Sequence, residues 1–116
     1  MKLVRDRIPE LAASNGQPAS FHLADPTEYA ARLRAKLLEE AHEAAAATSP
    51  AELLEELGDV LQVLYALAHQ AGYHAAEVEC ARARKTAVCG SFTRGIVWHG
   101  PTHPLAARRI QAPPAP

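Results

Sequence analysis

Five acidic residues within residues 37–64, LLEEAHEAAAATSPAELLEELGDVLQVL, have a spacing that could hold a metal ion. They form the pattern E-E-x-x-E, followed after twelve residues by E-x-x-D, and are Glu39, Glu40, Glu43, Glu56 and Asp59. Each residue of a helix turns by about 100°, so the first three acids share one helix face. On the second segment Glu56 falls inside an apolar stripe and Asp59 lies on its edge. The pattern therefore predicts carboxylates that border a hydrophobic core.

Carboxylates in such a position need a compensating positive charge. An unpaired ionised carboxylate on a core face is strongly unfavourable, or its pKa shifts until it is neutral. Hard oxygen ligands without a cluster of histidines or thiolates suit Mg²⁺ or Mn²⁺, which commonly bridge to substrate phosphates. The alternative is a solvated acidic face, or pairing of the acids with Arg32, Arg34 and Lys36.

Two helices that begin with the same signals should position the acids. DPTE at residues 25–28 and SPAE at residues 49–52 each offer a capping side chain, a proline at the first helical position and a glutamate three residues after the cap. We expect helices from Pro26 to about Ala47 and from Pro50 to about Gly72. The short connection favours antiparallel neighbours, which would bring the two acidic faces together.

Shorter elements should flank this pair. We expect a short helix over Val4–Ser14, ended by Asn15-Gly16, and a fourth helix from Ala75 to about Ala87. Alternation in SFHL (residues 20–23) and GIVW (residues 95–98) predicts two short strands that could pair.

The predicted fold class is all-α, a helical bundle with a central antiparallel helix pair, to which these two short strands could be added. Residues 1–98 would form one domain, and the Pro- and Ala-rich residues 99–116 a flexible tail. A chain of this length buries only about 60 to 70 per cent of its unfolded surface, so burial shared with a second copy would help.

Composition excludes several classes of function. The formal net charge is -1, which argues against binding nucleic acid or a membrane surface through bulk electrostatics. No apolar run is long enough to span a bilayer, and MKLVRDRIPE lacks the apolar core of a signal peptide, so we expect a cytoplasmic protein. No G-x-x-x-x-G-K-[ST] loop is present to hold phosphates.

The acidic pattern, EEAHE followed by ELGD, resembles the E-E-x-x-E … E-x-x-D signature of the MazG-like all-α nucleoside-triphosphate pyrophosphohydrolases. The opening KLVRDRIPE is similar to the start of a subgroup often described as phosphoribosyl-ATP pyrophosphohydrolase-like. Together the two matches run from Lys2 to about Trp98.

The resemblance implies a Mg²⁺ site in a helical bundle completed by homo-oligomerisation, as a dimer or a tetramer. Metal-binding positions of the family are matched by Glu39, Glu43, Glu56 and Asp59. Glu40 matches a position that binds metal or orients the attacking water, and is the expected catalytic residue. The family's reaction cleaves a nucleotide between its α and β phosphates, releasing the monophosphate and pyrophosphate.

Basic residues should assist at the phosphates. Lys85 shares a helix face with apolar neighbours and Arg94 matches a basic residue of the subgroup, while Arg5 and Arg7 match its opening motif. The alternatives are a Lys85 stem that lies over the core with its head in water, and an arginine–aspartate network that holds the first helix. Cys89 replaces an arginine that the subgroup tends to carry.

The leading hypothesis is Mg²⁺-dependent hydrolysis of non-standard or surplus nucleoside triphosphates, a house-cleaning activity. A second enzymatic hypothesis is hydrolysis of phosphoribosyl-ATP by the same cleavage. The third is a helical dimer that binds nucleotide or regulates without turnover, which the altered segment CGSF favours.

Overall fold

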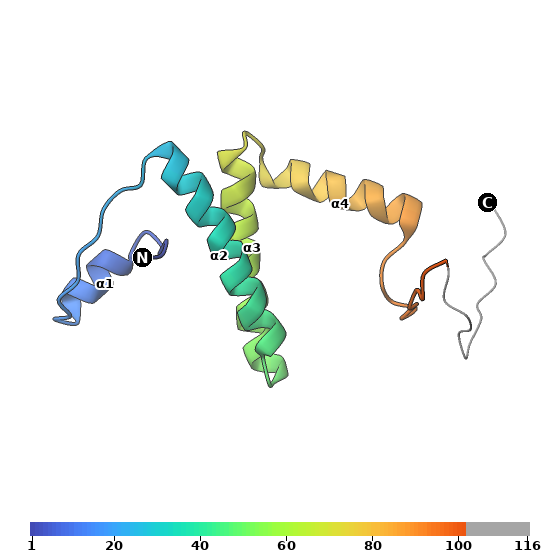
Figure 1. Cartoon of the computed structure of the whole chain (residues 1–116), viewed down its shortest axis with the longest axis horizontal. Coiled ribbons are helices and arrows are strands. Elements are labelled where there is room, and N and C mark those ends of the chain that lie inside the picture. Colours follow the sequence, from blue (N-terminus) through green and yellow to red (C-terminus); the bar gives the residue numbers. More distant parts are fainter. Residues whose placement is uncertain (102–116) are drawn as a thin grey trace. The chain divides into compact units, whose positions relative to one another are not determined.

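The computed structural model describes residues 1–101 and is all-helical over that range. Its helices are α1 (Ile8–Ser14), α2 (Pro26–Ala46), α3 (Pro50–Gln70) and α4 (Ala75–Cys89) (Figure 1). The chain divides into two compact units, of which the first is Met1–Arg82 and the second begins at Ala83. Within the described range, none of the helices is long and apolar enough to cross a membrane. The predicted all-α class is confirmed.

Caps define where α2 and α3 begin. The Asp25 carboxylate accepts a hydrogen bond from the Glu28 amide at 2.8 Å, and the Ser49 hydroxyl accepts one from the Glu52 amide at 3.1 Å. Each helix then begins at a proline, which lacks the amide hydrogen that this position would leave unpaired. The two helices run antiparallel, side by side (Figure 1). Both predicted helices are confirmed to within two residues.

The core lies between α2 and α3, the only described helices that pack against each other. Leu33 of α2 is 1% exposed, and Val63 and Ala68 of α3 are also buried. Among these apolar side chains lies one buried charged residue, Glu40, which is 7% exposed. One of the predicted acids is therefore part of the core.

Helix α1 begins four residues later than the expected start at Val4. Pro9 lacks an amide hydrogen and is tolerated only in the first turn of a helix, which places the start at Ile8. The Ile8 amide donates to the Arg5 carbonyl at 3.1 Å, so a turn precedes the helix. The N-terminal segment, residues 1–7, is consequently non-helical, and residues 3–7 line a cleft together with side chains of α2 and α3.

Helix α4 runs two residues beyond the expected end at Ala87 and stops before Gly90, whose φ is +80°. No residue of α4 is buried within the described part of the chain. A left-handed φ cannot continue an α-helix, and glycine adopts it more readily than other residues. The helix therefore ends before Gly90.

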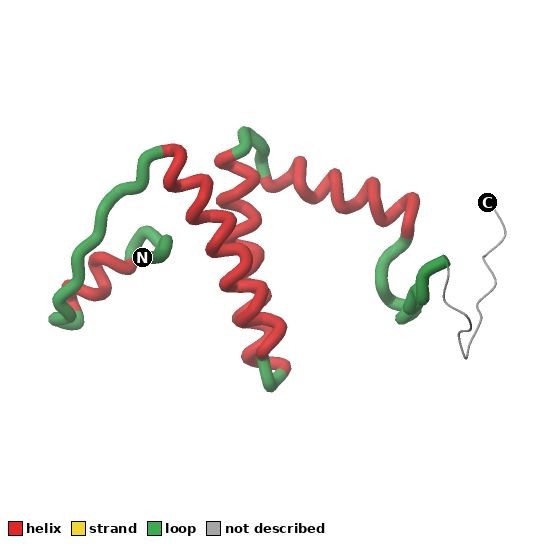
Figure 2. The backbone as a smooth tube through the Cα atoms, viewed as in Figure 1, coloured by secondary structure: helices red, strands yellow, loops and turns green. Residues whose placement is uncertain are grey.

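The two predicted strands are wrong. Residues 20–23 and 95–98 are loop, and the described chain contains no strand (Figure 2). A strand needs a partner for its backbone and a buried face, yet Leu23 is 99% and Trp98 82% exposed. An alternation of apolar and polar residues over only four positions is too short to identify a strand. Most of the predicted tail, residues 102–116, lies outside the described residues.

Candidate active site

Three carboxylates from the two central helices converge on one point. Glu40 and Glu43 of α2 and Glu56 of α3 each offer an oxygen within 4.8 Å of those of the other two. The spacing i, i+3 places the first two on one helix face, and the antiparallel hairpin brings the third to them. Glu40 is buried, Glu56 half-buried and Glu43 exposed, so the cluster reaches from the core to solvent. We call these three residues the carboxylate cluster.

Two oxygens of the cluster lack a hydrogen-bond partner. Glu40 Oε2 and Glu56 Oε2 are buried, and no donor of the described residues reaches them. Burial raises the pKa of Glu56, and the neighbouring charges of Glu43, Asp59 and Glu40 raise it further. Buried carboxylate oxygens without donors are costly, so this arrangement fits a bound cation. Oxygen donors alone suit a hard divalent metal.

Lys36 compensates part of this charge. Its Nζ lies 3.1 Å from Glu40 Oε1 and 3.4 Å from Glu39 Oε2, and its side chain is 17% exposed. Burial alone would lower the pKa of Lys36, but the hydrogen bonds to Glu40 and Glu39 outweigh it and raise this pKa. Glu40 therefore has two different oxygens: Oε1 faces an ammonium group, and Oε2 has no donor.

The N-terminal segment supplies two further cations. Arg5 Nη2 donates to Asp59 Oδ1 at 2.7 Å, and Lys2 Nζ donates to Glu39 Oε1 at 3.4 Å. Burial would raise the pKa of Glu39, but the positive charges of Lys36 and Lys2 outweigh burial and lower this pKa. Two of the predicted metal ligands are thus paired with lysine or arginine in this structure.

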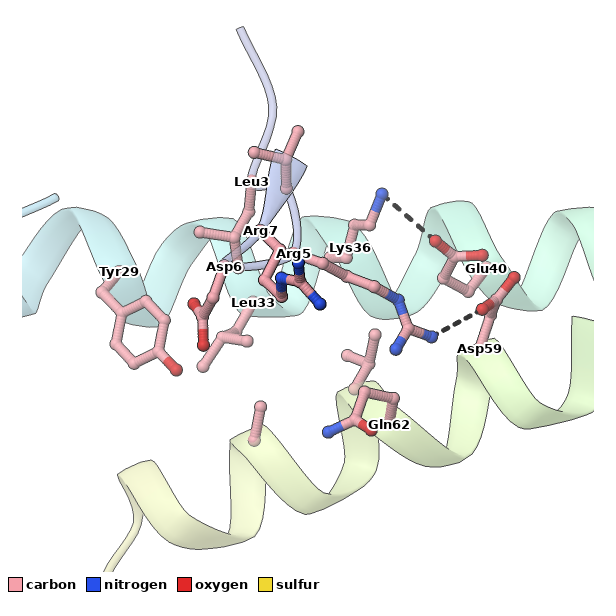
Figure 3. A pocket seen from close by; sticks show the side chains of 13 residues that line it. Leu3, Arg5, Asp6, Arg7, Tyr29, Leu33, Lys36, Glu40, Asp59 and Gln62 are labelled. Atoms are coloured by element: carbon pink, nitrogen blue, oxygen red, sulfur yellow. Dashed lines mark hydrogen bonds and ion pairs between the residues drawn. The ribbon is translucent and has the colours of Figure 1, made fainter. Parts of the chain in front are cut away.

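A cleft of about 480 Å³ lies between the N-terminal segment and the central helices. Figure 3 shows Glu40 and Asp59 at one end, joined to Lys36 and Arg5, and Tyr29 at the other. Apolar side chains of both helices, among them Leu33, Val63 and Ala66, line it as well. Its volume and mixed lining are typical of a small-molecule site. One end adjoins the carboxylate cluster, and at the other end Figure 3 shows the Asp6 carboxylate beside the aromatic ring of Tyr29.

The structure brings together some of the predicted acids and not others. Glu40, Glu43 and Glu56 form the cluster, whereas Glu39 and Asp59 lie beside it and bind cations of the N-terminal segment. Asp59 is still near enough to raise the pKa of Glu56. Metal binding by Glu39 and Asp59 stays a prediction.

The predicted phosphate-binding residues fall in both units. Arg5 and Arg7 line the cleft, where Arg7 Nε also lies 3.6 Å from Glu10 Oε2. Lys85, on α4, and Arg94, in a hollow formed by residues 89–97, belong to the second unit. Their contribution to this site stays a prediction.

The sequence offered Lys36 as one of three cations that could pair with the acids, and the structure shows that pairing. It gave no role to Lys2 or Gln62, which are part of the site or its cleft. Lys36 precedes Glu39 and Glu40 by three and four residues, a spacing that identifies such pairs on a helix. No local signal could reveal the pairing of Arg5 with Asp59, because 54 residues separate them.

Comparison with known proteins gives one family. The family profile described as Phosphoribosyl-ATP pyrophosphohydrolase (PRA-PH) matches residues 11–85. This span contains all five predicted acids and Lys36, but not the N-terminal segment with Lys2 and Arg5. No curated protein and no solved structure matches the chain.

Proposed function

Because the chain belongs to the phosphoribosyl-ATP pyrophosphohydrolase family, within the MazG-like all-α superfamily, we propose that it cleaves a nucleoside triphosphate between the α and β phosphates. The family is one of pyrophosphohydrolases, enzymes that hydrolyse acid anhydride bonds of nucleotide-like substrates. The products would be a nucleoside monophosphate and pyrophosphate. The expected substrates are non-standard or surplus nucleoside triphosphates.

One observation carries the proposal: the carboxylate cluster has two buried oxygens without donors. Glu43 and Glu56 would hold Mg²⁺, or Mn²⁺ in its place, with Glu39 and Asp59 as further ligands once their cations are displaced. When bound, Mg²⁺ neutralises charge that develops on the phosphate oxygens and favours an ionised nucleophile.

Glu40 is the residue we propose to orient the attacking water. Its Oε1 is fixed by Lys36 at 3.1 Å, which holds the carboxylate in one rotamer. Its Oε2 is buried and has no competing donor from the described chain. A carboxylate in this position can accept a proton from water as the water attacks phosphorus. Lys36 acts as the positioning residue for Glu40.

The lining of the cleft favours one orientation of a bound nucleotide. Its triphosphate would lie at the end formed by Glu40 and Asp59, where Arg5 and Arg7 contribute positive charge, and its base at the end formed by Tyr29. Tyrosine offers a flat apolar face on which a base can stack. Phosphate binding by Lys85 and Arg94 stays a prediction from the family resemblance.

A second candidate substrate is phosphoribosyl-ATP, which the description of the matched family favours. It requires the same cleavage, so the products alone do not separate the two. The third hypothesis, a module that binds nucleotide without turnover, is disfavoured by membership of a hydrolase family.

The test is a comparison of phosphoribosyl-ATP with standard, deoxy and damaged nucleoside triphosphates, each with Mg²⁺ and with chelator. Products are separated by ion-exchange chromatography. Monophosphate and pyrophosphate, formed only with Mg²⁺, are the expected result. Release of orthophosphate and a diphosphate would contradict α–β cleavage, and turnover of phosphoribosyl-ATP alone would select the second candidate.

We also propose that a second copy of the chain covers α3. Four leucines at helical spacing form a stripe on this helix whose side chains are between 38% and 69% exposed: Leu54, Leu57, Leu61 and Leu64. A monomer rarely exposes a contiguous apolar stripe of this kind, and a homodimer can bury it symmetrically. A dimer, or a tetramer built from it, would complete the helical bundle.

A further inference from the structure

Arg5 and Asp59 form an ion pair at the mouth of the proposed phosphate end of the cleft. The distance from Arg5 Nη2 to Asp59 Oδ1 is 2.7 Å, and both side chains are accessible, 56% and 40% exposed. Among the described residues Arg5 makes no other side-chain hydrogen bond, so most guanidinium donors are not engaged. The pair therefore has unused hydrogen-bonding capacity that faces the cleft (Figure 3).

The charge arrangement around this pair suggests that Arg5 substitutes for a metal ion. Asp59 follows Glu56 by three residues on α3, so its carboxylate lies on the same side of the helix and adds to the negative charge that a divalent cation would neutralise. A guanidinium on Asp59 supplies part of that positive charge in the metal-free protein. Accessible ion pairs contribute little to stability, so breaking this one should be easy.

We propose that Arg5 exchanges partners during the reaction cycle: it binds Asp59 in the metal-free enzyme and binds the substrate's phosphates once a divalent cation occupies the carboxylate cluster. The ligand class is a polyphosphate, for which pyrophosphate is the simplest representative. The planar guanidinium suits two oxygens of one phosphate, a geometry that lysine cannot reproduce. This inference rests on the proposed metal site, but not on turnover.

The exchange predicts that removing the Arg5 side chain changes the affinities for Mn²⁺ and for pyrophosphate in opposite directions. In Arg5→Met the competing cation is lost, so Mn²⁺ should bind the nucleotide-free protein more tightly, by up to about fivefold. Pyrophosphate should bind the metal-loaded protein more weakly, by roughly 10- to 100-fold, the range for a hydrogen bond to a charged group. A purely structural arginine that anchors the N-terminal segment would weaken both.

The experiment measures Mn²⁺ affinity by electron paramagnetic resonance and pyrophosphate affinity by calorimetry at saturating Mg²⁺, using the full chain. Arg34→Met, at an exposed position of α2, is the matched control for loss of one positive charge. Arg5→Lys should restore wild-type Mn²⁺ affinity but only part of the pyrophosphate affinity. Arg5→Gln, which also removes the charge, substitutes for Arg5→Met should that variant not fold.

Tighter Mn²⁺ with weaker pyrophosphate in Arg5→Met, and neither change in Arg34→Met, would support the exchange. A fall in both affinities, or unchanged affinities, would overturn it, as would a wild-type protein that binds no Mn²⁺. Both readouts measure equilibrium binding and do not depend on turnover. If the wild-type protein binds metal and pyrophosphate but hydrolyses no nucleotide, the proposed reaction is wrong while the partner exchange of Arg5 can still be tested.

Discussion

Glu43 on α2 and Glu56 on α3 hold carboxylate oxygens within 4.8 Å of each other across the central hairpin, with Glu40 as the third member of the group. Like charges at this separation repel, so the hairpin must hold them together against their interaction. Packing of Leu33 and Val63 in the same interface provides the opposing stabilisation. The site is thus built into the core that defines the fold.

Glu56→Gln should stabilise the metal-free protein at neutral pH. Burial and three neighbouring carboxylates raise the pKa of Glu56 above its ordinary value of 4.5. A raised pKa means that Glu56 favours folding below pH 4.5 and that this contribution is lost as pH rises through the raised pKa. The Tm advantage of the variant should therefore be absent below pH 4.5 and grow towards neutrality, as measured by calorimetry in chelator.

Glu55→Gln is the control for this effect, since the adjacent Glu55 is exposed and outside the cluster. Its Tm should follow that of the wild type at every pH. Equal pH profiles for the two variants would show that Glu56 carries no penalty in the folded state.

Mg²⁺ should reverse the order of stability between wild type and Glu56→Gln. A ligand that binds only the folded state at 100 times its Kd adds about 2.7 kcal/mol. The wild type should gain this stabilisation and the variant, which lacks one charged ligand, much less. Thermal unfolding across a Mg²⁺ titration measures this stabilisation. An equal rise in Tm for both proteins would show that the metal binds elsewhere.

Lys36→Met should destabilise the metal-free fold by about 1–3 kcal/mol, because Glu40 Oε1 would become a second buried oxygen without a donor on the same carboxylate. Urea unfolding gives the value. Lys2→Met removes a neighbouring cation whose side chain is 65% exposed, and should cost less than about 1 kcal/mol. Similar losses in both variants would argue against a special role for Lys36.

Leu61→Lys should shift the protein towards a monomer, because it places a charge in the middle of the exposed stripe on α3. Sedimentation equilibrium measures the change. The same substitution at Leu23, a loop residue that is 99% exposed, should leave the assembly unchanged. A wild-type protein that sediments as a monomer at every concentration would contradict the proposed dimer.

The central helices and the acids were predictable because their signals are local. Asp25 and Ser49 are capping residues that mark the starts of the two helices. A period of 3.6 residues places Glu40 and Glu56 next to apolar stripes. The strands at residues 20–23 and 95–98 were predicted from too short a pattern and are loops.

Long-range relationships were not predictable. Nothing near Arg5 indicates that it reaches Asp59, 54 residues along the chain, because that contact depends on the turn before α1 and on the pairing of α2 with α3. The division of acids between the carboxylate cluster and the N-terminal cations likewise depends on tertiary distances of a few ångströms.

The most direct test of the account is Mg²⁺-dependent pyrophosphate release by wild type, Glu56→Gln and Glu55→Gln, using the best nucleotide of the panel. Loss of a partner outside the metal's own ligands commonly costs 10- to 100-fold, so loss of the Glu56 charge should lower kcat/KM by at least about 100-fold. Glu55→Gln should match the wild type. Undiminished pyrophosphate release by a folded Glu56→Gln protein would contradict a reaction centred on the carboxylate cluster.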